Sequence, residues 1–417
     1  YGERKQWMPL RIICLASYLT QNGINAKAYN ADCDLTEPEK VMSYTERFES
    51  GRFFLENLQG NNYIWEEMKT VLKEISPKII GISILTEALG SVKKSLEIIR
   101  EILPDAIIIG GGPHAEIDAE YLIDEMQFDY VVKGDGEETL REICSSILYE
   151  SKNVYKPSII KSKRIEIYQL PIPKLETHYR YELYRKVGRK MNLTSSRGGC
   201  PFSCSFCYCS KYKYSLRFQS PERVIEEIQH HIDSYGTRKV FFVDDTFTVN
   251  KQYVSRICDL IIQNKINFSW TCTTRAGQID KELLFKMKQS GCNSIHLGIE
   301  SGSTRILTLL NKRIDFNMVE ESVDLIKKSE IDCRMFFMAG LPTESSNDLQ
   351  KSIDCIRRFK PDETILDIYV PIPGTPLYDF ICNMGVPLHS IDWCSFSREK
   401  VPYKRYVDDS DGRYDLK

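Results

Sequence analysis

Three cysteines crowd one short glycine-opened stretch of the chain. Cys200, Cys204 and Cys207 follow a Gly-Gly pair, so one loop carries three thiols. Thiolates at this spacing can bind three irons of a cubane iron–sulfur cluster and leave the fourth iron open to an exchangeable ligand. An open iron suits a cluster that does chemistry, so the stretch predicts a reactive metal centre.

Two other interpretations of the same loop are possible. A structural zinc site needs a fourth protein ligand, and Cys209 or His230 could supply it, but neither completes the paired spacing of a zinc finger. Three core cysteines that meet by chance are the other alternative, but Gly, Pro and Ser residues surround these thiols. The spacing favours the iron–sulfur cluster.

The cysteine loop resembles the signature of the radical S-adenosylmethionine (SAM) superfamily, which has an aromatic residue before its third cysteine. Cys200, Cys204, Phe206 and Cys207 match that signature. The resemblance implies that the three cysteines bind a [4Fe–4S] cluster whose free iron holds the amino and carboxylate groups of SAM. An electron then cleaves the sulfonium, and the 5'-deoxyadenosyl radical abstracts a hydrogen atom. It also implies that Phe206 and Tyr208 lie near the adenine.

Polar residues also follow the strands expected downstream of this loop. We expect Glu300, Ser301 and Gly340 to contact SAM, because a carboxylate can accept a hydrogen bond from a ribose hydroxyl or an ammonium, and a glycine lets backbone approach a ligand. Arg275 ends another strand and could pair with the methionyl carboxylate, or be a solvated surface residue. The adjacent carboxylates at 244–245 point to opposite faces of a strand, so we assign no catalytic pair.

Short apolar strands alternate with helical patterns in both halves of the chain, which is typical of α/β folds with parallel strands and right-handed crossovers. The first half predicts a doubly wound, Rossmann-like domain over residues 1–150. The second half predicts a partial TIM-type (β/α)6 barrel over 190–370. A proline-interrupted linker is expected over 151–189 and a C-terminal extension over 371–417. Because no strand precedes the first helix, we expect that strand to lie upstream of residue 1.

The glycine-rich strand ends of the first half resemble the cobalamin-binding domain that precedes many members of the superfamily. The matching stretches are 81–86, 104–114 and 129–137. The resemblance implies cobalamin at the C-terminal edge of the sheet, where glycines let backbone groups approach the nucleotide tail and the corrin amides. Glycines that only make turns are the alternative. The residues expected to contact cobalamin are Ser83, Thr86, Gly110, Gly111, Gly112, His114, Gly134 and Gly136.

The sequence departs from the methionine-synthase type of cobalamin domain in one respect. The Asp-x-His-x-x-Gly motif that supplies a lower axial histidine to cobalt does not occur, and His114 is the only histidine before residue 178. That loop could lie upstream of Tyr1. A packing role for His114 is an alternative to contact with the corrin. We expect cobalamin to bind without a protein histidine on cobalt.

The composition argues against several classes of protein. The 417 residues include 56 Lys and Arg against 58 Asp and Glu, so a net charge of −2 gives no general attraction to nucleic acid or anionic membranes. Fourteen cysteines are too few for a disulfide scaffold. No apolar run approaches the ~20 residues of a membrane span. We expect a cytoplasmic protein without a membrane span and without a nucleic-acid partner.

Together, the two resemblances imply a cobalamin-dependent radical SAM methyltransferase that transfers a methyl group from methylcobalamin to an unactivated carbon. It would need an external electron donor such as flavodoxin or ferredoxin. A non-methylating cyclase or ring-rearranging enzyme shares every motif, and the motifs do not separate the two.

Two further classes fit less well. A methylthiolating tRNA-modifying enzyme should carry additional cluster cysteines in its first domain, but Cys14, Cys33 and Cys144 are widely scattered. A cobalamin carrier or sensor explains the first half and not the cysteine loop. The substrate stays open among a small molecule, a lipid precursor and a protein side chain, and the oligomeric state is open too. Tyr369 and Trp393 could line a substrate entrance or pack onto the barrel.

Overall fold

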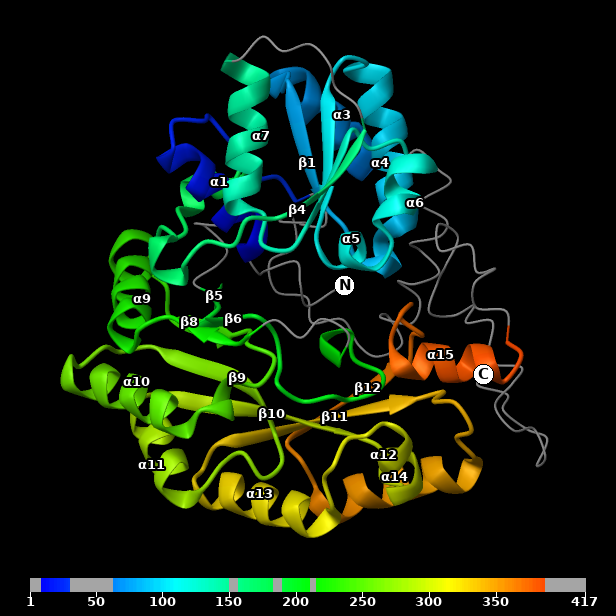
Figure 1. Cartoon of the computed structure of the whole chain (residues 1–417). Helices are drawn as coiled ribbons and strands as arrows, with labels where there is room; N and C mark the ends of the chain where they lie inside the picture. The colour runs from blue at the N-terminus through cyan, green and yellow to red at the C-terminus, as the bar shows by residue number, and fades with distance from the viewer. Residues whose placement is uncertain (1–8, 31–62, 150–156, 183–189, 211–214, 387–417) are drawn as a thin grey trace. The chain divides into compact units, whose positions relative to one another are not determined.

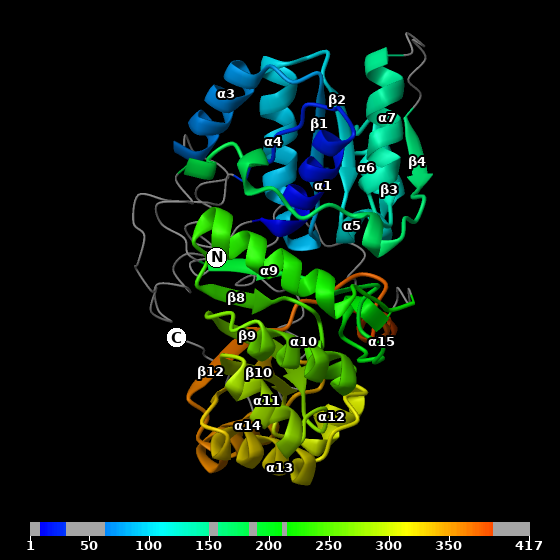
Figure 2. The same cartoon turned by 90° about the vertical axis from the view of Figure 1, so that its left-hand side faces the viewer.

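Both halves of the chain are built from parallel strands that helices connect (Figures 1 and 2). The computed structural model describes residues 9–30, 63–149, 157–182, 190–210 and 215–386. Within them, the chain divides into two compact units on either side of residue 188. Trp393 and the strand expected upstream of residue 1 lie outside the described residues.

The first unit contains a four-stranded parallel sheet in the order β1-β2-β3-β4. Helices α3, α4 and α6 pack on one face of it, around Ile108 and Phe128, while α7 packs on the other face, against Ile109 and Val132. This confirms the doubly wound prediction. The strands are β1 (Ile79–Ser83), β2 (Ile107–Gly111), β3 (Tyr130–Lys133) and β4 (Ser158–Lys161). The helices are α1 (Leu10–Gln21), α3 (Tyr63–Ile75), α4 (Leu89–Ile102), α5 (Pro113–Ile117), α6 (Ala119–Asp124) and α7 (Glu137–Tyr149).

Residues expected to form a linker are part of the first unit instead. Strand β4 pairs with β3 from Ser158 to Lys161. Farther along, His178 forms a parallel bridge with Ala28, and the Lys174 amide donates a 2.8 Å hydrogen bond to Ser17 Oγ. The sequence did not predict these elements because prolines interrupt the stretch. A four-residue strand and short 3-10 turns are also too short to show a periodic pattern of apolar residues.

The second unit contains a six-stranded parallel sheet in the order β12-β11-β10-β9-β8-β5. Strands β5 and β12 do not pair, so the sheet curves without closing and forms a half-barrel, as the partial-barrel prediction requires. The strands are β5 (Lys190–Leu193), β8 (Lys239–Phe242), β9 (Ser269–Arg275), β10 (Cys292–Glu300), β11 (Asp332–Ala339) and β12 (Glu363–Ile368). The helices are α9 (Pro221–Tyr235), α10 (Lys251–Gln263), α11 (Lys281–Gln289), α12 (Thr304–Leu309), α13 (Phe316–Lys328), α14 (Ser346–Phe359) and α15 (Pro376–Asn383).

The core of the second unit lies between the sheet and the crossover helices, which all cover one face (Figure 1). Alternate strand residues such as Phe242, Trp270 and Phe337 are at most 1% exposed within it. Because side chains alternate along a strand, the intervening residues point to the opposite, concave face. In a parallel sheet all the carboxyl ends meet at one edge, so the loops after β8, β9, β10 and β11 emerge together there.

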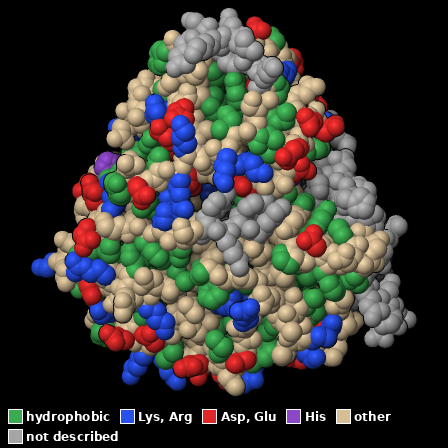
Figure 3. Space-filling model, in the orientation of Figure 1, with side chains coloured by type: hydrophobic (Ala, Val, Ile, Leu, Met, Phe, Trp, Pro, Cys, Tyr) green, Lys and Arg blue, Asp and Glu red, His purple; other side chains and the backbone are tan. Residues whose placement is uncertain are grey.

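The surface mixes both signs of charge. On the face drawn in Figure 3, acidic and basic side chains of the described residues lie close together. Among the described residues, exposed charges also form ion pairs, such as Arg358 with Glu320 and Arg256 with Glu222. Within the described ranges, no helix combines the length and the apolar character that crossing a bilayer requires.

Two glycines with positive φ test how tightly the half-barrel is packed. Gly291 (φ +96°) precedes β10, and a Cβ there would lie 2.3 Å from the Phe268 carbonyl oxygen. Gly236 (φ +67°) ends α9 in open space. Gly236→Ala should cost about 1 kcal/mol from its left-handed backbone alone. Gly291→Ala should cost roughly 1–3 kcal/mol more, because the backbone must also move. Urea unfolding followed by circular dichroism measures the difference, and equal midpoints for the two variants would contradict the packing described.

Candidate functional site

The cysteine loop is closed at its base by a short antiparallel ladder of β6 (Ser196–Arg197) and β7 (Arg217–Phe218). Its opening glycine has φ +103°, and a Cβ on Gly198 would lie 2.4 Å from the Ser215 carbonyl oxygen. Only glycine fits so close an approach in this conformation. A second contact holds the loop in place: the Ser205 amide donates a 2.9 Å hydrogen bond to the carbonyl oxygen of Leu310, the residue after α12.

The three thiols differ in their surroundings. Cys204 is 8% exposed, and Arg275 Nη1 lies 3.5 Å from its sulfur as a hydrogen-bond donor. Cys200 Sγ lies 3.4 Å from Thr246 Oγ1, and burial raises the pKa of the Cys200 thiol. Cys207 is half-buried. No cysteine of the described part of the chain forms a disulfide, so all three thiols are available as ligands.

Three thiols on one loop are a donor set that a cubane cluster can use. Among the residues that the structure describes, no three Cys, His, Asp or Glu side chains surround one point as ligands of one metal ion do. In a cubane cluster each thiolate binds its own iron, so three sulfurs on one loop need not share a point. Zinc needs its ligands around one ion, and His230, one possible fourth ligand, packs against His231 and Tyr235 on α9.

A fourth thiol belongs to the same loop. Cys209 Sγ donates a hydrogen bond of 3.3 Å to Asp245 Oδ2 and lies beside Cys207. The neighbouring Asp244 points elsewhere, because it is buried and accepts hydrogen bonds from the Ser195 amide and hydroxyl. The adjacent carboxylates therefore act separately: Asp244 fixes the backbone before β6, and Asp245 faces the cysteine loop.

Arg275 is a buried residue of the site and not a solvated surface arginine. Its side chain is 6% exposed, and its guanidinium stacks 4.3 Å from the centre of the Phe202 ring. Together with the contact to Cys204, this places a positive charge at the end of β9 against the cysteine loop.

Glu300 sits in strained backbone at the end of β10. Its φ is +77°, and the register of β10 with β11 shifts between Gly298 and Glu300. Glu300 Oε1 lies 2.7 Å from Lys312 Nζ, and both side chains are largely buried. Residues other than glycine that are held at a positive φ are strained, and such residues are concentrated at functional sites.

Lys312 links two residues that the sequence assigned to SAM. Its ammonium pairs with Glu300 and lies 5.9 Å from the centre of the Phe206 ring. Gly298 leaves room for this pair, since a Cβ there would lie 2.8 Å from Glu300 Oε1. Sequence reasoning missed Lys312, because a lysine after a short helix carries no signal of burial. Tyr208 begins a 3-10 turn, Tyr208–Ser210, in the same loop and is half-buried.

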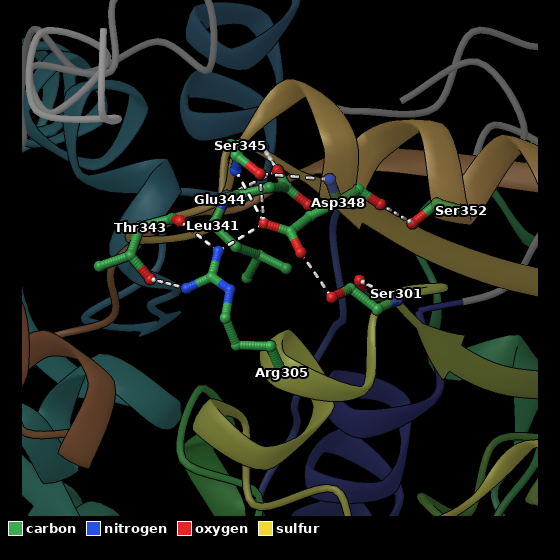
Figure 4. A network of polar contacts seen from close by, with 10 residues as sticks. Ser301, Arg305, Leu341, Thr343, Glu344, Ser345, Asp348 and Ser352 are labelled. Carbon is green, nitrogen blue, oxygen red and sulfur yellow. Dashed lines mark hydrogen bonds and ion pairs between the residues drawn. The ribbon is translucent and has the colours of Figure 1, made fainter. Parts of the chain in front are cut away.

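A hydrogen-bond network joins the loops after β10 and β11 (Figure 4). Its centre is Asp348 on α14, which is 2% exposed and accepts from Ser303 Oγ at 2.5 Å, from Ser345 Oγ at 2.7 Å and from Arg305. Burial would raise the pKa of Asp348, but these hydrogen bonds outweigh burial and hold the pKa well below its ordinary range. Ser301 is fully buried here, and its hydroxyl accepts from the Ser303 amide at 3.2 Å.

The backbone of Gly340 is held by a second buried carboxylate, that of Glu344, which follows β11. Glu344 Oε2 accepts from the Gly340 amide at 2.7 Å and from the Leu341 amide at 3.2 Å. Burial raises the pKa of Glu344 to about 7, and its Oε1 is buried without a partner among the described residues. Gly340 has φ +75°, so a side chain there would be strained.

In the first unit, the ends of β1 and β2 come into contact. His114 Nδ1 lies 3.1 Å from Thr86 Oγ1, and both residues are at most 4% exposed. A Cβ on Gly112 would lie 2.9 Å from the Ile84 amide nitrogen and 3.0 Å from Ser83 Oγ. Burial lowers the pKa of His114 to about 4, and its Nε2 is buried without a partner in the described structure.

The other expected cobalamin glycines lie on the neighbouring strands. Gly110 and Gly111 end β2, and a Cβ on Gly110 would press on Phe128 at 3.1 Å. Gly134 and Gly136 follow β3; a Cβ on Gly134 would lie 2.2 Å from Ser162 Oγ, next to the end of β4. Close packing thus requires some of these glycines, and all of them lie at carboxyl ends of parallel strands.

The Asp348 network should be essential for stability. Asp348→Asn removes the charge that holds Arg305 and two hydroxyl donors, and we expect a loss of about 2–3 kcal/mol at neutral pH. Because the folded-state pKa is depressed, this stabilisation is complete above the ordinary Asp pKa and is lost as the pH falls below about 4. Arg305→Ala should cost less, since this arginine is half-exposed. Thermal unfolding at pH 7 compares the two variants, and a smaller loss for Asp348→Asn would contradict its central position.

Comparisons with known proteins assign both units. The radical SAM superfamily matches residues 195–356, and the B12 binding domain matches residues 53–144. These matches confirm both resemblances. A radical SAM domain implies SAM and a [4Fe–4S] cluster, and a B12-binding domain implies cobalamin, as expected from the sequence.

Individual relatives agree with the domain assignment. The chain is 28% identical over 347 residues to the uncharacterized methyltransferase PH0819 of Pyrococcus horikoshii, covering 80% of this chain and 75% of that protein. It is 24% identical over 336 residues to the anaerobic magnesium-protoporphyrin IX monomethyl ester cyclase of Cereibacter sphaeroides, covering 75% of this chain and about half, 54%, of the cyclase.

A solved structure has the same fold over nearly the whole chain. The radical SAM methyltransferase TsrM from Kitasatospora setae, with cobalamin and a [4Fe–4S] cluster bound, superposes with a TM-score of 0.65 at 15% identity, covering 96% of this chain and 80% of TsrM. The chain therefore contains a B12-binding domain at 53–144 followed by a radical SAM domain at 195–356.

Proposed function

We propose that this enzyme transfers a methyl group from methylcobalamin to an unactivated carbon of its substrate. A B12-binding domain and a cysteine loop with three free thiols in one chain support a cobalamin-dependent radical SAM enzyme, and the observation that favours methyl transfer is the relative named as a methyltransferase, at 28% identity over 80% of this chain. A cobalamin carrier has no need of the loop. The methyltransferase relative covers more of this chain than the cyclase does.

Cys200, Cys204 and Cys207 would hold the [4Fe–4S] cluster, which when bound supplies an electron through an iron that no thiolate occupies. Side chains of the protein surround the expected position of the cluster. Arg275 donates a hydrogen bond to the Cys204 sulfur, and hydrogen bonds to cluster sulfurs tune the reduction potential. The positive charge of Arg275 also suits the methionyl carboxylate of SAM, which would bind at the same end of the loop.

The remaining SAM contacts would come from the loops after β10 and β11. Phe206 and Tyr208 would lie near the adenine, with Glu300, Ser301 and Gly340 lining the rest of the site. The Glu300–Lys312 pair would orient the carboxylate for a ribose hydroxyl. The Asp348 network holds both loops in place, so that neither must be ordered when SAM binds.

Cobalamin would bind at the carboxyl ends of β1, β2 and β3. Backbone groups of Gly110, Gly111 and Gly112 and of Gly134 and Gly136 would approach it, with Ser83, Thr86 and His114 as side-chain contacts. His114 is neutral at physiological pH and keeps a buried Nε2 free of protein partners in the described structure. A buried polar atom of this kind needs a partner, and the nucleotide tail of cobalamin can provide one.

A cyclase or ring-rearranging enzyme is the second candidate, because a cyclase relative matches 75% of this chain. The two candidates differ in what happens to SAM. A methyltransferase consumes one SAM to methylate cobalamin and cleaves another, whereas a cyclase only cleaves SAM.

An anaerobic assay separates these functions. The chain is reconstituted with iron, sulfide and hydroxocobalamin, then given reductant and SAM, and the products are analysed by mass spectrometry. We expect 5'-deoxyadenosine, S-adenosylhomocysteine and methylcobalamin. Deoxyadenosine with bound corrin but without methylcobalamin would favour the cyclase. Absence of bound corrin would overturn the cobalamin proposal.

Cys204→Ala provides the matching variant. We expect it to bind cobalamin as the wild type does, because the two sites lie in different domains, and to lose deoxyadenosine formation together with the cluster absorbance. Cys382→Ser on α15 is the control, since this half-buried cysteine has no assigned role, and it should keep both properties. Retention of a redox-active cluster in Cys204→Ala would remove Cys204 from the ligand set.

The role of His114 can be tested with a truncated ligand. His114→Ala should weaken cobalamin binding roughly fivefold to tenfold through the loss of one hydrogen bond. It should leave the affinity for cobinamide, which lacks the nucleotide tail, unchanged. Absorbance titration measures both. Equal losses for the two ligands would show that His114 supports the fold or the corrin instead of the tail.

A further inference from the structure

The α12–α13 turn (residues 309–312) holds the cysteine loop through the residues that lie between its cysteines. The Ser205 amide donates to the Leu310 carbonyl oxygen at 2.9 Å, and the Ser205 hydroxyl donates to the preceding carbonyl oxygen at 2.8 Å. Asn311 Nδ2 donates to the Ser203 carbonyl oxygen at 2.7 Å. Because Ser203 and Ser205 flank the second cluster cysteine, this turn fixes that cysteine from both sides.

Lys312, the last residue of this turn, contacts the cysteine loop and the end of β10 at the same time. Its ammonium lies 5.9 Å from the centre of the Phe206 ring, within reach of a cation–π contact. Phe206 directly precedes the third cluster cysteine. The same ammonium pairs with Glu300 Oε1 at 2.7 Å, and the side chains of Lys312 and Glu300 are only 8% and 12% exposed. One buried cation therefore joins Glu300 to the cysteine loop.

The backbone around this ion pair leaves it little room to move. The Lys312 amide donates to the Leu307 carbonyl oxygen at 3.0 Å. Asn311 has φ +49°, in the left-handed region that asparagine adopts more readily than most residues. On the other side, a Cβ on Gly298 would lie 2.8 Å from Glu300 Oε1 and 3.2 Å from Lys312 Nζ. Since the pair is packed between β10 and the turn, a displacement of Lys312 must also move Glu300.

Shared contacts of this kind make two binding events depend on each other. A ligand that holds the Glu300 carboxylate also orders Lys312, and a cluster that holds the cysteine loop orders Lys312 through Phe206. Lysine and glutamate side chains lose conformational entropy when they are ordered. The first ligand to bind bears this loss, so the second binds more tightly than it would alone. By thermodynamic linkage, the gain in affinity is the same in both directions.

We propose that Lys312 is a positioning residue that couples binding of the SAM nucleoside to binding of the cluster. Lys312 acts through Glu300 and Phe206 and needs no contact of its own with SAM or with iron. The inference rests on the proposed contact between Glu300 and the ribose of SAM. It deepens the proposed function, because it makes the affinity of that site for a nucleoside depend on whether the cluster is bound.

Adenosine is a suitable probe, because it carries the ribose hydroxyls but lacks the amino and carboxylate groups that would bind the free iron. Anaerobic equilibrium dialysis measures its dissociation constant for the full chain with and without the reconstituted cluster. We expect the wild type to bind adenosine about fivefold more tightly when the cluster is present. In Lys312→Met the two affinities should be equal. Lys312→Arg, which keeps the charge, should restore part of the difference.

Two further variants separate the coupling from general effects on the fold. Asn311→Ala removes the hydrogen bond to Ser203 and leaves the ion pair of Glu300 unchanged. It should keep the adenosine affinity of the cluster-free chain and reduce the gain that the cluster brings. Lys286→Met is the matched control, because Lys286 forms a 2.9 Å ion pair with Asp259 between the outer helices α11 and α10. It should keep the full wild-type difference.

Two outcomes with adenosine binding intact would overturn the coupling alone: equal affinities of the wild type with and without cluster, or the full difference in Lys312→Met. If that variant does not fold, the full difference in Asn311→Ala would overturn the coupling instead. Absence of adenosine binding in every form would remove Glu300 from the SAM site, and the coupling with it. Because dialysis needs no SAM cleavage, the result does not depend on whether the enzyme is a methyltransferase.

Discussion

Parallel pairing of the strands is the constraint on which the rest of this structure depends. A parallel strand must be followed by a crossover, so every carboxyl end in a sheet reaches the same edge and every amino end the opposite one. The cysteine loop and the loops after β8, β9, β10 and β11 therefore meet although up to about 140 residues separate them along the chain. The same rule brings Thr86 and His114 together in the first unit.

Holding those loops rigid requires buried polar groups, and the chain uses carboxylates for this purpose. Asp348 holds the loops after β10 and β11, Asp244 holds the backbone before β6, and Glu344 caps the turn at Gly340. Each buried carboxylate accepts at least two hydrogen bonds, which offset its desolvation. The site is thus preorganised by residues that need not touch a ligand, and ligand binding does not have to order these loops.

The groups left without partners are as informative as those that are paired. In the described residues, His114 Nε2 lies at the strand ends of the B12-binding unit, and Glu344 Oε1 lies in the loop after β11. Native proteins rarely leave buried polar atoms unpaired.

Much of this could be predicted from the sequence, because the responsible features are local. The spacing of Cys200, Cys204 and Cys207, the glycine-rich strand ends and the strand–helix alternation each occupy a short stretch, and they indicated the fold class, the family and the cofactors. Tertiary structure decided what depends on contacts between distant residues. The sequence did not decide whether Arg275 is a surface residue, and the structure buries it in contact with Cys204. The position of Lys312 likewise depends on its ion pair with Glu300, which the sequence did not predict. Strand β4 and the residues up to 182, expected to be a linker, joined the first unit because a short strand is defined by its neighbour β3 and not by its own pattern.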